Sequence, residues 1–434
     1  MDDVTILHGD ALTMLRTLPT GSVHCVVTSP PYYGLRDYGT ATWIGGDPAC
    51  EHRPGSQSRV GKTTLQGATA TTGHQHEGYR LTCGKCGALR QDDQIGLEPT
   101  VDAYVARLVE VFEEVRRVLR ADGTLWLNIG DSYASGKGTC FNPGGGPKSY
   151  IQEKERFPLD RGSVATLRES GLKSKDLIGI PWRVALALQA AGWWLRSDII
   201  WAKRAPMPES VTDRPTRSHE HVFLLTKRER YYYDQEAVRE PQVKGAAGST
   251  FTEGKTGHNG NGRQSEAERQ DNPAGRNQRD VWTLGPEPYP DAHFATFPTE
   301  IPRRAILAGT SERGCCPCGA PWARIIENSG TGPQRQSRKN EQVRLTRFAG
   351  QAWERWKAEN PNVTTGWAPT CTCPPADPIP CTVLDPFGGS GTTAAVAVGL
   401  GRRAILVELN AAYIELQRAR IEKVQRPLLS AVAS

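Results

Sequence analysis

The sequence has no long apolar run, no solenoid repeat and no strong excess of charge of one sign. No stretch reaches the roughly 18 apolar residues that a membrane-spanning helix needs, so we predict a protein with no membrane partner. The first ten residues, MDDVTILHGD, are acidic where a secretion signal is basic and then apolar. We therefore expect a cytoplasmic location, in which eleven cysteines indicate metal ligands or free thiols before disulfides.

The charge balance is only mildly basic. Lys and Arg total 53 against 47 Asp and Glu, which gives a net charge of +6 and a sequence pI near 8.7. A pI above about 9 marks a nucleic-acid-binding domain outright, so this charge permits a polyanionic partner without requiring one. The 434 residues include 45 Gly and 31 Pro, more than the average usage of these two residues. We interpret the excess as loops and insertions around a folded core.

Short apolar runs alternate with helical segments along the chain, and this alternation predicts a doubly wound α/β sheet. The clearest helix is 101–120, where apolar residues recur at helical spacing with charges elsewhere. The strands that we expect are 4–7, 23–28, 124–129, 194–201, 221–226, 382–384 and 403–409, and the helices are 11–18, 101–120, 181–191, 393–398 and 411–424.

Three segments interrupt this pattern: 44–95, 240–280 and 310–380. The first and the third each carry two pairs of soft ligands, the set that tetrahedral Zn²⁺ prefers. We therefore predict two structural zinc sites, with free thiols in loops as the alternative. The predicted ligands are Cys50, His52, Cys83 and Cys86 at the first site and Cys315, Cys318, Cys371 and Cys373 at the second, with Cys316 as a spare residue and His74 and His76 as competing ligands at the first.

A glycine-rich turn lies between a predicted strand and a predicted helix in VLDPFGGSGTTAAVAVGLG. Gly388, Gly389 and Gly391 let the backbone approach a ligand closely, and the helix start offers free N–H groups. One strand later, Glu408 is placed to bind ribose hydroxyls. The turn lacks the GK[ST] ending of a phosphate-binding loop and the GxGxxG spacing. These features favour a cofactor that contains a nucleoside over glycines that serve the turn alone.

A second motif, SPPYY, follows the strand at 23–28. Ligands bind at such strand ends in open α/β sheets. Two prolines make the loop rigid, Ser29 offers a hydroxyl and Tyr32 an aromatic face. This set suits a planar base with an exocyclic amine, which Ser29 and the Pro30 carbonyl would hold. A proline-stiffened turn with a packing tyrosine is the alternative for the motif taken alone.

Together the two motifs resemble those of the amino-methyltransferases of DNA, in which a [DNS]PP[YFW] catalytic motif and a cofactor motif similar to DPFxGSGT occur. The catalytic motif comes first here, which is the order of the beta class of that family. HFATFPTEIPRRAI at 293–306, IPWRVALALQAAGWWLRSDIIWAK and HEHVFLLTK are similar to further core elements of the family. The resemblance implies a Rossmann-like methyltransferase sheet with permuted motif order. It also implies methyl transfer from S-adenosylmethionine to a base amine of double-stranded DNA.

The resemblance also implies roles for single residues. Ser29, Pro30 and Tyr32 would hold a base flipped out of DNA, and Pro31 belongs to the same catalytic motif. Of the cofactor, Asp385 would contact the methionine amino group, Glu408 the ribose hydroxyls and Asp10 the adenine amine. The other cofactor-binding residues that we expect are Pro386, Phe387, Gly388, Gly389, Gly391 and Thr392 and, on the methionine side, His293 and Phe297.

The base itself is a separate prediction. In this family, serine in the first catalytic position is associated with cytosine N4, and aspartate or asparagine with adenine N6. We therefore predict cytosine N4, with adenine N6 as the alternative. A non-catalytic, zinc-containing DNA-binding protein is the rival class, against which the two intact motifs argue, and an RNA methyltransferase is a weaker third.

The domain organisation follows from these motifs. A target-recognition region is expected at 236–282, where Arg263, Arg269, Arg276 and Arg279 could reach phosphate or guanine. The family further allows a homodimer and a cognate restriction endonuclease as partners. The predicted units are a catalytic half at 1–43 and 96–235, a zinc-binding insertion at 44–95, a cofactor-binding half at 283–309 and 381–426 and a second zinc-binding insertion at 310–380.

Overall fold

A computed structural model provides the structure of the chain. It describes most of the predicted core and parts of the insertions. The described residues are 3–34, 42–52, 83–91, 94–98, 100–134, 171–206, 208–241, 275–285, 287, 297–327 and 363–424.

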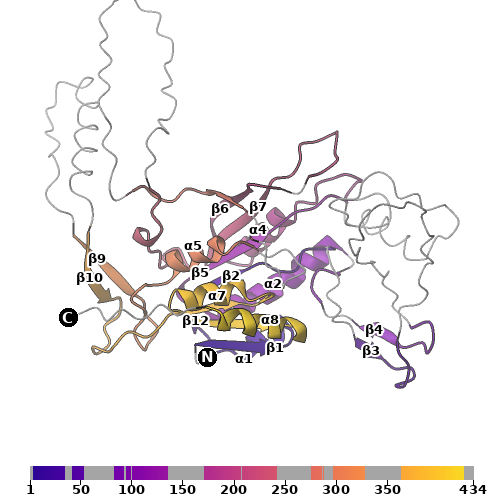
Figure 1. Cartoon of the computed structure of the whole chain (residues 1–434), viewed down its shortest axis with the longest axis horizontal. Helices are drawn as coiled ribbons and strands as arrows, with labels where there is room; N and C mark the ends of the chain where they lie inside the picture. Colours follow the sequence, from indigo (N-terminus) through magenta and orange to yellow (C-terminus); the bar gives the residue numbers. More distant parts are fainter. Residues whose placement is uncertain are drawn as a thin grey trace, which may run out of the picture.

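The core of the molecule is one mixed sheet of eight strands (Figure 1). β7 runs antiparallel to both of its neighbours, and every other neighbouring pair in this sheet is parallel. The predicted α/β fold is therefore confirmed. The strands, in spatial order, are β1 (Val4–His8), β12 (Arg403–Glu408), β11 (Thr382–Asp385), β2 (Val23–Thr28), β5 (Leu119–Ile129), β7 (His219–Thr226), β6 (Trp194–Lys203) and β8 (Val281–Leu284).

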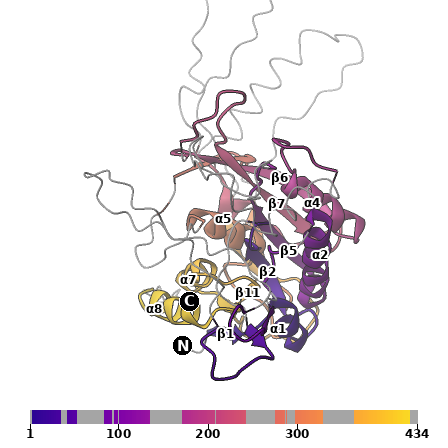
Figure 2. The ribbon, with the colours of Figure 1, turned by 90° about the vertical axis from the view of Figure 1, so that its right-hand side faces the viewer.

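Helices cover both faces of this sheet (Figure 2). Neighbouring residues of a strand point to opposite faces, so Leu125 of β5 joins one hydrophobic core and Trp126 the other. The first core lies under α1 (Ala11–Thr17), α2 (Val101–Val118) and α4 (Ile180–Ala190), and the second under α5 (Glu300–Gly309), α7 (Thr392–Gly399) and α8 (Ala411–Glu422).

Helix α2 shows why these segments form where the sequence predicts them. The Thr100 side chain caps the helix start by accepting from the Ala103 N–H at 3.1 Å. Buried residues then recur along one face from Val101 to Val118. The helix ends at Val118, two residues before the predicted end, because Leu119 is extended and begins β5. Among the described residues, no helix is long and apolar enough to cross a membrane.

A small antiparallel hairpin borders the first insertion, and another lies within the third. The first is formed by β3 (Thr42–Ile44) and β4 (Leu89–Gln91), and the second by β9 (Trp322–Glu327) and β10 (Val363–Pro369). Figure 1 shows the two hairpins at opposite ends of the molecule, with the sheet between them. A short 3-10 turn, η1 (Glu236–Val238), follows β7.

Strands β2 and β11 are neighbours although the chain between them is most of the protein. They are parallel, with Cys25 opposite Val383 and Val26 opposite Leu384. Their carboxyl ends therefore lie side by side at one edge of the sheet. The chain continues to opposite sides of the sheet from these two strands. Ligands bind at such a topological switch point in open α/β sheets.

Candidate functional site

The two sequence motifs meet at the carboxyl ends of β2 and β11. Thr28, the last residue of β2, donates its hydroxyl to Asp385 at 2.6 Å, and Asp385 is the last residue of β11. SPPYY begins directly after Thr28 and PFGGSGTT directly after Asp385. A hydrogen bond between side chains thus joins β2, which precedes the first motif, to β11, which precedes the second.

Asp385 is the centre of this junction. Its carboxylate also accepts from Thr393 Oγ1 at 2.8 Å and from the Phe387 N–H at 3.1 Å, and the residue is only 2% exposed. Burial raises the pKa of Asp385 to about 7, although the bonds from Thr28 and Thr393 act in the opposite direction. The side chain that we expect to contact a cofactor therefore also ties β2, β11 and α7 together.

The SPPYY loop is fixed by contacts on several sides. The Tyr104 hydroxyl of α2 donates to the Pro31 carbonyl at 2.8 Å. Pro30, the next residue toward the strand, is buried. Ser29 Oγ lies 3.5 Å from the Tyr32 hydroxyl. The loop is thus anchored at Pro31, while the Ser29 hydroxyl makes only a long contact with Tyr32.

Three residues next to this loop were not predicted from the sequence. The Tyr32 hydroxyl donates to Glu220 Oε2 at 2.6 Å, and Asn128 and Lys203 donate to the same carboxylate. Glu220 lies in β7, Asn128 in β5 and Lys203 at the end of β6. All three residues lie near the strand ends that form the ligand-binding edge. Sequence reasoning could have identified Glu220 in this way only if β7 had been known to be antiparallel, because Glu220 is near the start of its strand.

The glycine-rich loop is shaped by helix α8 as well as by any ligand. A Cβ at Gly388 would lie 2.8 Å from Gln417 Nε2, and one at Gly391 would lie 3.2 Å from Gln417 Cα. Gly391 also has φ +77° at the start of α7, a left-handed conformation that favours glycine. Buried Gln417 donates to the Gly389 carbonyl at 2.9 Å. Close packing against α8 and the backbone conformation at Gly391 therefore both require glycine in this loop. This requirement is compatible with cofactor binding.

Glu408 ends β12 beside this loop. Its two oxygens accept from the Gly389 N–H at 2.8 Å and the Asn410 N–H at 2.9 Å. Burial raises the pKa of Glu408, against the effect of these backbone bonds. Asp10, two residues after the neighbouring β1, caps α1 by accepting from the Thr13 N–H at 3.0 Å. Both carboxylates thus stand at the ligand-binding edge, where each supports a loop or a helix start.

The remaining predicted cofactor residues are placed less directly. Phe387 packs partly buried against the first core, and Thr392 is buried and accepts from Arg420 Nη1 at 2.7 Å. Pro386 lies between Asp385 and Phe387 in the loop after β11. Phe297 packs against the second core just before α5, and His293 lies outside the described residues.

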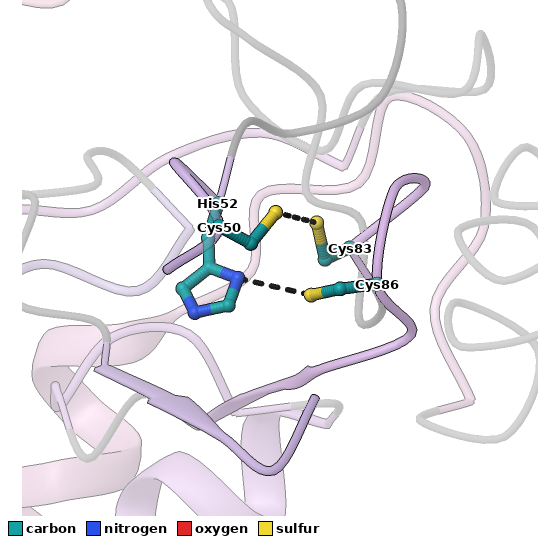
Figure 3. A group of neighbouring side chains, drawn as sticks. All are labelled: Cys50, His52, Cys83 and Cys86. Carbon is teal, nitrogen blue, oxygen red and sulfur yellow. Dashed lines mark hydrogen bonds between the residues drawn. The ribbon is translucent and has the colours of Figure 1, made fainter. Parts of the chain in front are cut away.

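The first cysteine cluster has the composition that we predicted. Side-chain atoms of Cys50, His52, Cys83 and Cys86 lie within 4.8 Å of one another (Figure 3). The Cys50 and Cys83 sulfurs are 3.9 Å apart, and Cys86 Sγ lies 3.2 Å from His52 Nδ1. A zinc tetrahedron with Zn–S bonds of about 2.3 Å has S···S edges of about 3.8 Å. The donor set and its spacing therefore fit this ion, while His74 and His76 lie outside the described residues.

The second cluster differs from the prediction by one residue. Cys316, Cys318, Cys371 and Cys373 lie within 4.8 Å of one another, so the placement of Cys315 as a ligand and Cys316 as the spare residue is wrong. Cys315 pairs in extended conformation with Ile379, and neighbouring extended residues point to opposite sides. Cys315 accordingly points inward, to His24 and Cys381. The grouping is then CxC with CxC instead of CxxC with CxC.

The expected target-recognition region is described only in part. Arg276 and Arg279 both bond to Glu240, at 3.2 Å and 3.1 Å. Arg263 and Arg269 lie outside the described residues. A role for any of these arginines in binding DNA stays a prediction.

Comparison with known proteins identifies the family of the chain. Residues 23–316 and 380–419 match the N6/N4 methyltransferase family, described as DNA methylase. The Type II methyltransferase M.Cfr9I of Citrobacter freundii is 41% identical over 310 residues, which are 71% of this chain and 74% of that protein. The Type II methyltransferase M.SmaI of Serratia marcescens is 32% identical over 419 residues, 96% of this chain and 90% of that protein.

Solved structures show a weaker likeness. The PvuII DNA methyltransferase, described as cytosine-N4-specific, aligns with a TM-score of 0.45 at 14% identity over 100% of this chain and 88% of that one. The assignment therefore rests on the sequence matches, and the residues that match the family include both motifs. By these matches the chain belongs to the N6/N4 family of DNA methyltransferases.

Proposed function

We propose that the protein transfers a methyl group from S-adenosylmethionine to the N4 amine of a cytosine flipped out of duplex DNA. Adenine N6 is the alternative target. The observation that carries the proposal is the Thr28–Asp385 hydrogen bond of 2.6 Å, because it brings the amine-binding motif and the cofactor motif to one edge of the sheet. The order of the two motifs along the chain is that of the beta class.

The residues at this edge fit the cofactor. Asp385 and Glu408 are carboxylates at neighbouring strand ends, suited to the methionine ammonium and the ribose hydroxyls. Asp10 and Phe387 flank them, and the helix start at Gly391 closes the loop. S-adenosylmethionine supplies an electrophilic methyl group on its sulfonium. The protein residues then serve to bind this molecule, to exclude water and to aim the base.

The SPPYY loop supplies acceptors for the amine. The lone pair of an exocyclic base amine is delocalised into the ring, which makes the nitrogen a poor nucleophile. Ser29 Oγ and the Pro30 carbonyl would accept from its two N–H groups, which draws the nitrogen toward sp³ geometry and exposes the lone pair. Holding the reactants in line supplies much of the acceleration. The base must leave the duplex to reach this loop, at a cost of a few kcal/mol.

The first experiment is mass spectrometry of nucleosides from DNA incubated with the protein and S-adenosylmethionine. We expect N4-methylcytosine. N6-methyladenine would keep the site and overturn the choice of base. No modified nucleoside on varied genomic DNA would favour a non-catalytic DNA-binding protein, or an RNA methyltransferase if RNA is modified instead. Because its relatives are named Type II methyltransferases, we expect a restriction endonuclease partner with the same recognition sequence.

We further propose that each cysteine cluster holds one structural zinc. Four-ligand sites with sulfur and nitrogen donors are closed, so the ion has no open position for catalysis. His52 also stacks on Trp43 of β3 at 5.3 Å, which holds its ring in place. The second cluster is tied to the core because the Gly319 carbonyl, next to Cys318, contacts His24 Nε2 of β2 at 2.9 Å. The first zinc ion would thus link the segments next to β3 and β4, and the second would stabilise a turn that contacts the sheet.

A further inference from the structure

Glu220 is a half-buried carboxylate at the ligand-binding edge for which neither motif accounts. Its side chain is 13% exposed and accepts three hydrogen bonds from protein donors. The Tyr32 hydroxyl and Asn128 Nδ2 share Oε2, at 2.6 Å and 3.3 Å, while the Lys203 ammonium donates to Oε1. Three strands and the catalytic loop therefore converge on one negative charge.

This charge determines the direction of a chain of hydroxyl groups. A carboxylate only accepts, so the Tyr32 O–H must point at Glu220. The Tyr32 oxygen is then left as an acceptor, and Ser29 Oγ donates to it over 3.5 Å. Such bonds are often long in the empty site and shorten when substrate enters. Burial and the neighbouring Glu220 both raise the pKa of Tyr32, so its phenol remains a donor.

The Tyr32 ring itself is held in position for this purpose. A Cβ at Gly130 would lie only 2.6 Å from Tyr32 Cε2, so the ring edge rests directly on the backbone that follows β5. On the loop side, Tyr104 secures the adjacent Pro31 carbonyl at 2.8 Å. The phenol oxygen therefore has little freedom to leave its place between Ser29 and Glu220.

We propose that Glu220 is a positioning residue that acts through Tyr32 to make Ser29 an acceptor toward the target amine. A serine hydroxyl alone can either donate or accept. When its proton is directed at Tyr32, its lone pairs face the base and can receive an amine N–H. This inference rests on the proposed function, since it needs a target that presents N–H groups, but it applies equally to cytosine N4 and adenine N6.

Replacing Glu220 by glutamine should reverse the chain. The Lys203 ammonium has only donors, so it keeps the amide oxygen and the amide N–H₂ turns toward Tyr32. The Tyr32 O–H then points at Ser29, and the Ser29 proton points at the amine. We expect Glu220→Gln to lower the single-turnover rate of methyl transfer on the order of 100-fold, with the affinities for DNA and S-adenosylmethionine within about twofold of wild type.

A second variant makes the test specific for proton direction. Tyr32→Phe keeps the ring but removes the hydroxyl, so Ser29 can rotate freely, and we expect a loss of about tenfold. The Glu220→Gln/Tyr32→Phe double variant should recover to that tenfold level, because no phenol is left to misdirect Ser29. A purely structural role of Glu220 predicts instead that the double variant is slower than either single variant.

The matched control is Glu236→Gln, which removes another half-buried glutamate, paired with Arg239 beyond the other end of β7. It should retain the wild-type rate. The proposal is overturned if Glu220→Gln or Tyr32→Phe reacts at the wild-type rate, or if the double variant shows no recovery. The product formed by the wild type separately decides the proposed function: N6-methyladenine would change the base but leave the rescue test valid, and absence of any product would overturn both.

Discussion

The ligand-binding edge of the sheet and the two cysteine clusters are built in different ways. At the edge, the buried carboxylate of Asp385 is held by hydrogen bonds from the β2 residue Thr28 and the α7 residue Thr393. In the clusters, the four ligand residues come from short turns beside the hairpins β3–β4 and β9–β10, and the second cluster also contacts β2 through the Gly319 carbonyl and His24. We therefore expect the edge to keep its shape without a ligand and the clusters to depend on a metal ion.

The largest expected effect is at the ligand-binding edge, where a substitution should lower the rate of methyl transfer without changing stability. Ser29→Ala removes an acceptor for the amine but no strong contact within the protein. Among the described residues, the hydrogen-bond partner of the Ser29 hydroxyl is the Tyr32 hydroxyl, at 3.5 Å. We expect methyl transfer to fall on the order of 100-fold or more, with unchanged cofactor affinity and unfolding temperature. Ser22→Ala, which removes a bond to the Pro19 carbonyl before the same strand, should keep full activity. Wild-type turnover of Ser29→Ala would refute its role.

In the clusters, a substitution should remove metal. Cys316→Ser takes one of four ligands from the second cluster, and we expect the zinc content to fall from two ions to one per chain. Cys315→Ser, a change of the adjacent residue outside the cluster, should keep two ions. Metal analysis of gently purified protein measures both. Loss of zinc in Cys315→Ser alone would restore the ligand set predicted from sequence.

Chelation separates the two regions further. If the clusters are structural, removal of zinc should lower the unfolding temperature while S-adenosylmethionine still binds at the sheet edge. Zinc binding by such sites contributes directly to folding free energy. Calorimetry of the protein before and after chelation, with cofactor titration of each sample, checks this. Loss of cofactor binding at a temperature where the chelated protein remains folded would show that the edge also depends on metal.

Asp385→Asn tests how the buried carboxyl group at the edge changes the pH dependence of stability. Burial raises the pKa of Asp385 to about 7, whereas an unfolded aspartate titrates near about 4. The folded protein thus holds this proton more tightly, so ionisation of Asp385 makes folding less favourable as pH rises from about 4 to about 7. The unfolding temperature of Asp385→Asn relative to wild type should therefore rise between pH 5 and pH 8. A change of the opposite sign would contradict the assignment.

The smallest expected effect concerns the glycine loop. Gly388→Ala would place a Cβ 2.8 Å from Gln417 Nε2 and 3.2 Å from Leu406 Cβ, which we expect to lower the free energy of unfolding by about 1–3 kcal/mol. Gly401→Ala meets nothing within 4 Å, and at φ +73° it should cost about 1 kcal/mol from backbone strain alone. Denaturant unfolding compares the two. Equal decreases in the free energy of unfolding would show that the Gln417 side chain moves away from the new Cβ at no cost in stability.

Local features were predictable because they depend on nearby residues. The period of apolar residues in 101–120 predicts α2 within two residues of its end, since burial of one face is encoded in the spacing. The SPPYY and DPFGGSGTT motifs identified both halves of the candidate site. Cys316 and Cys315 could not be distinguished this way, because the choice depends on which of two adjacent side chains faces Cys381 across an extended pairing with Ile379.

The sequence by itself determined most strands of the central sheet and most of its helices, the two motifs with their order and all but one of the clustered cysteines. Only the tertiary structure decided that β2 and β11 are neighbours, that β7 is reversed and that Glu220 therefore reaches Tyr32. The physical reason is the range of the interactions. Periodicity and turn chemistry act over a few residues, whereas the contacts that complete the site join residues hundreds of positions apart and exist only once the whole sheet has formed.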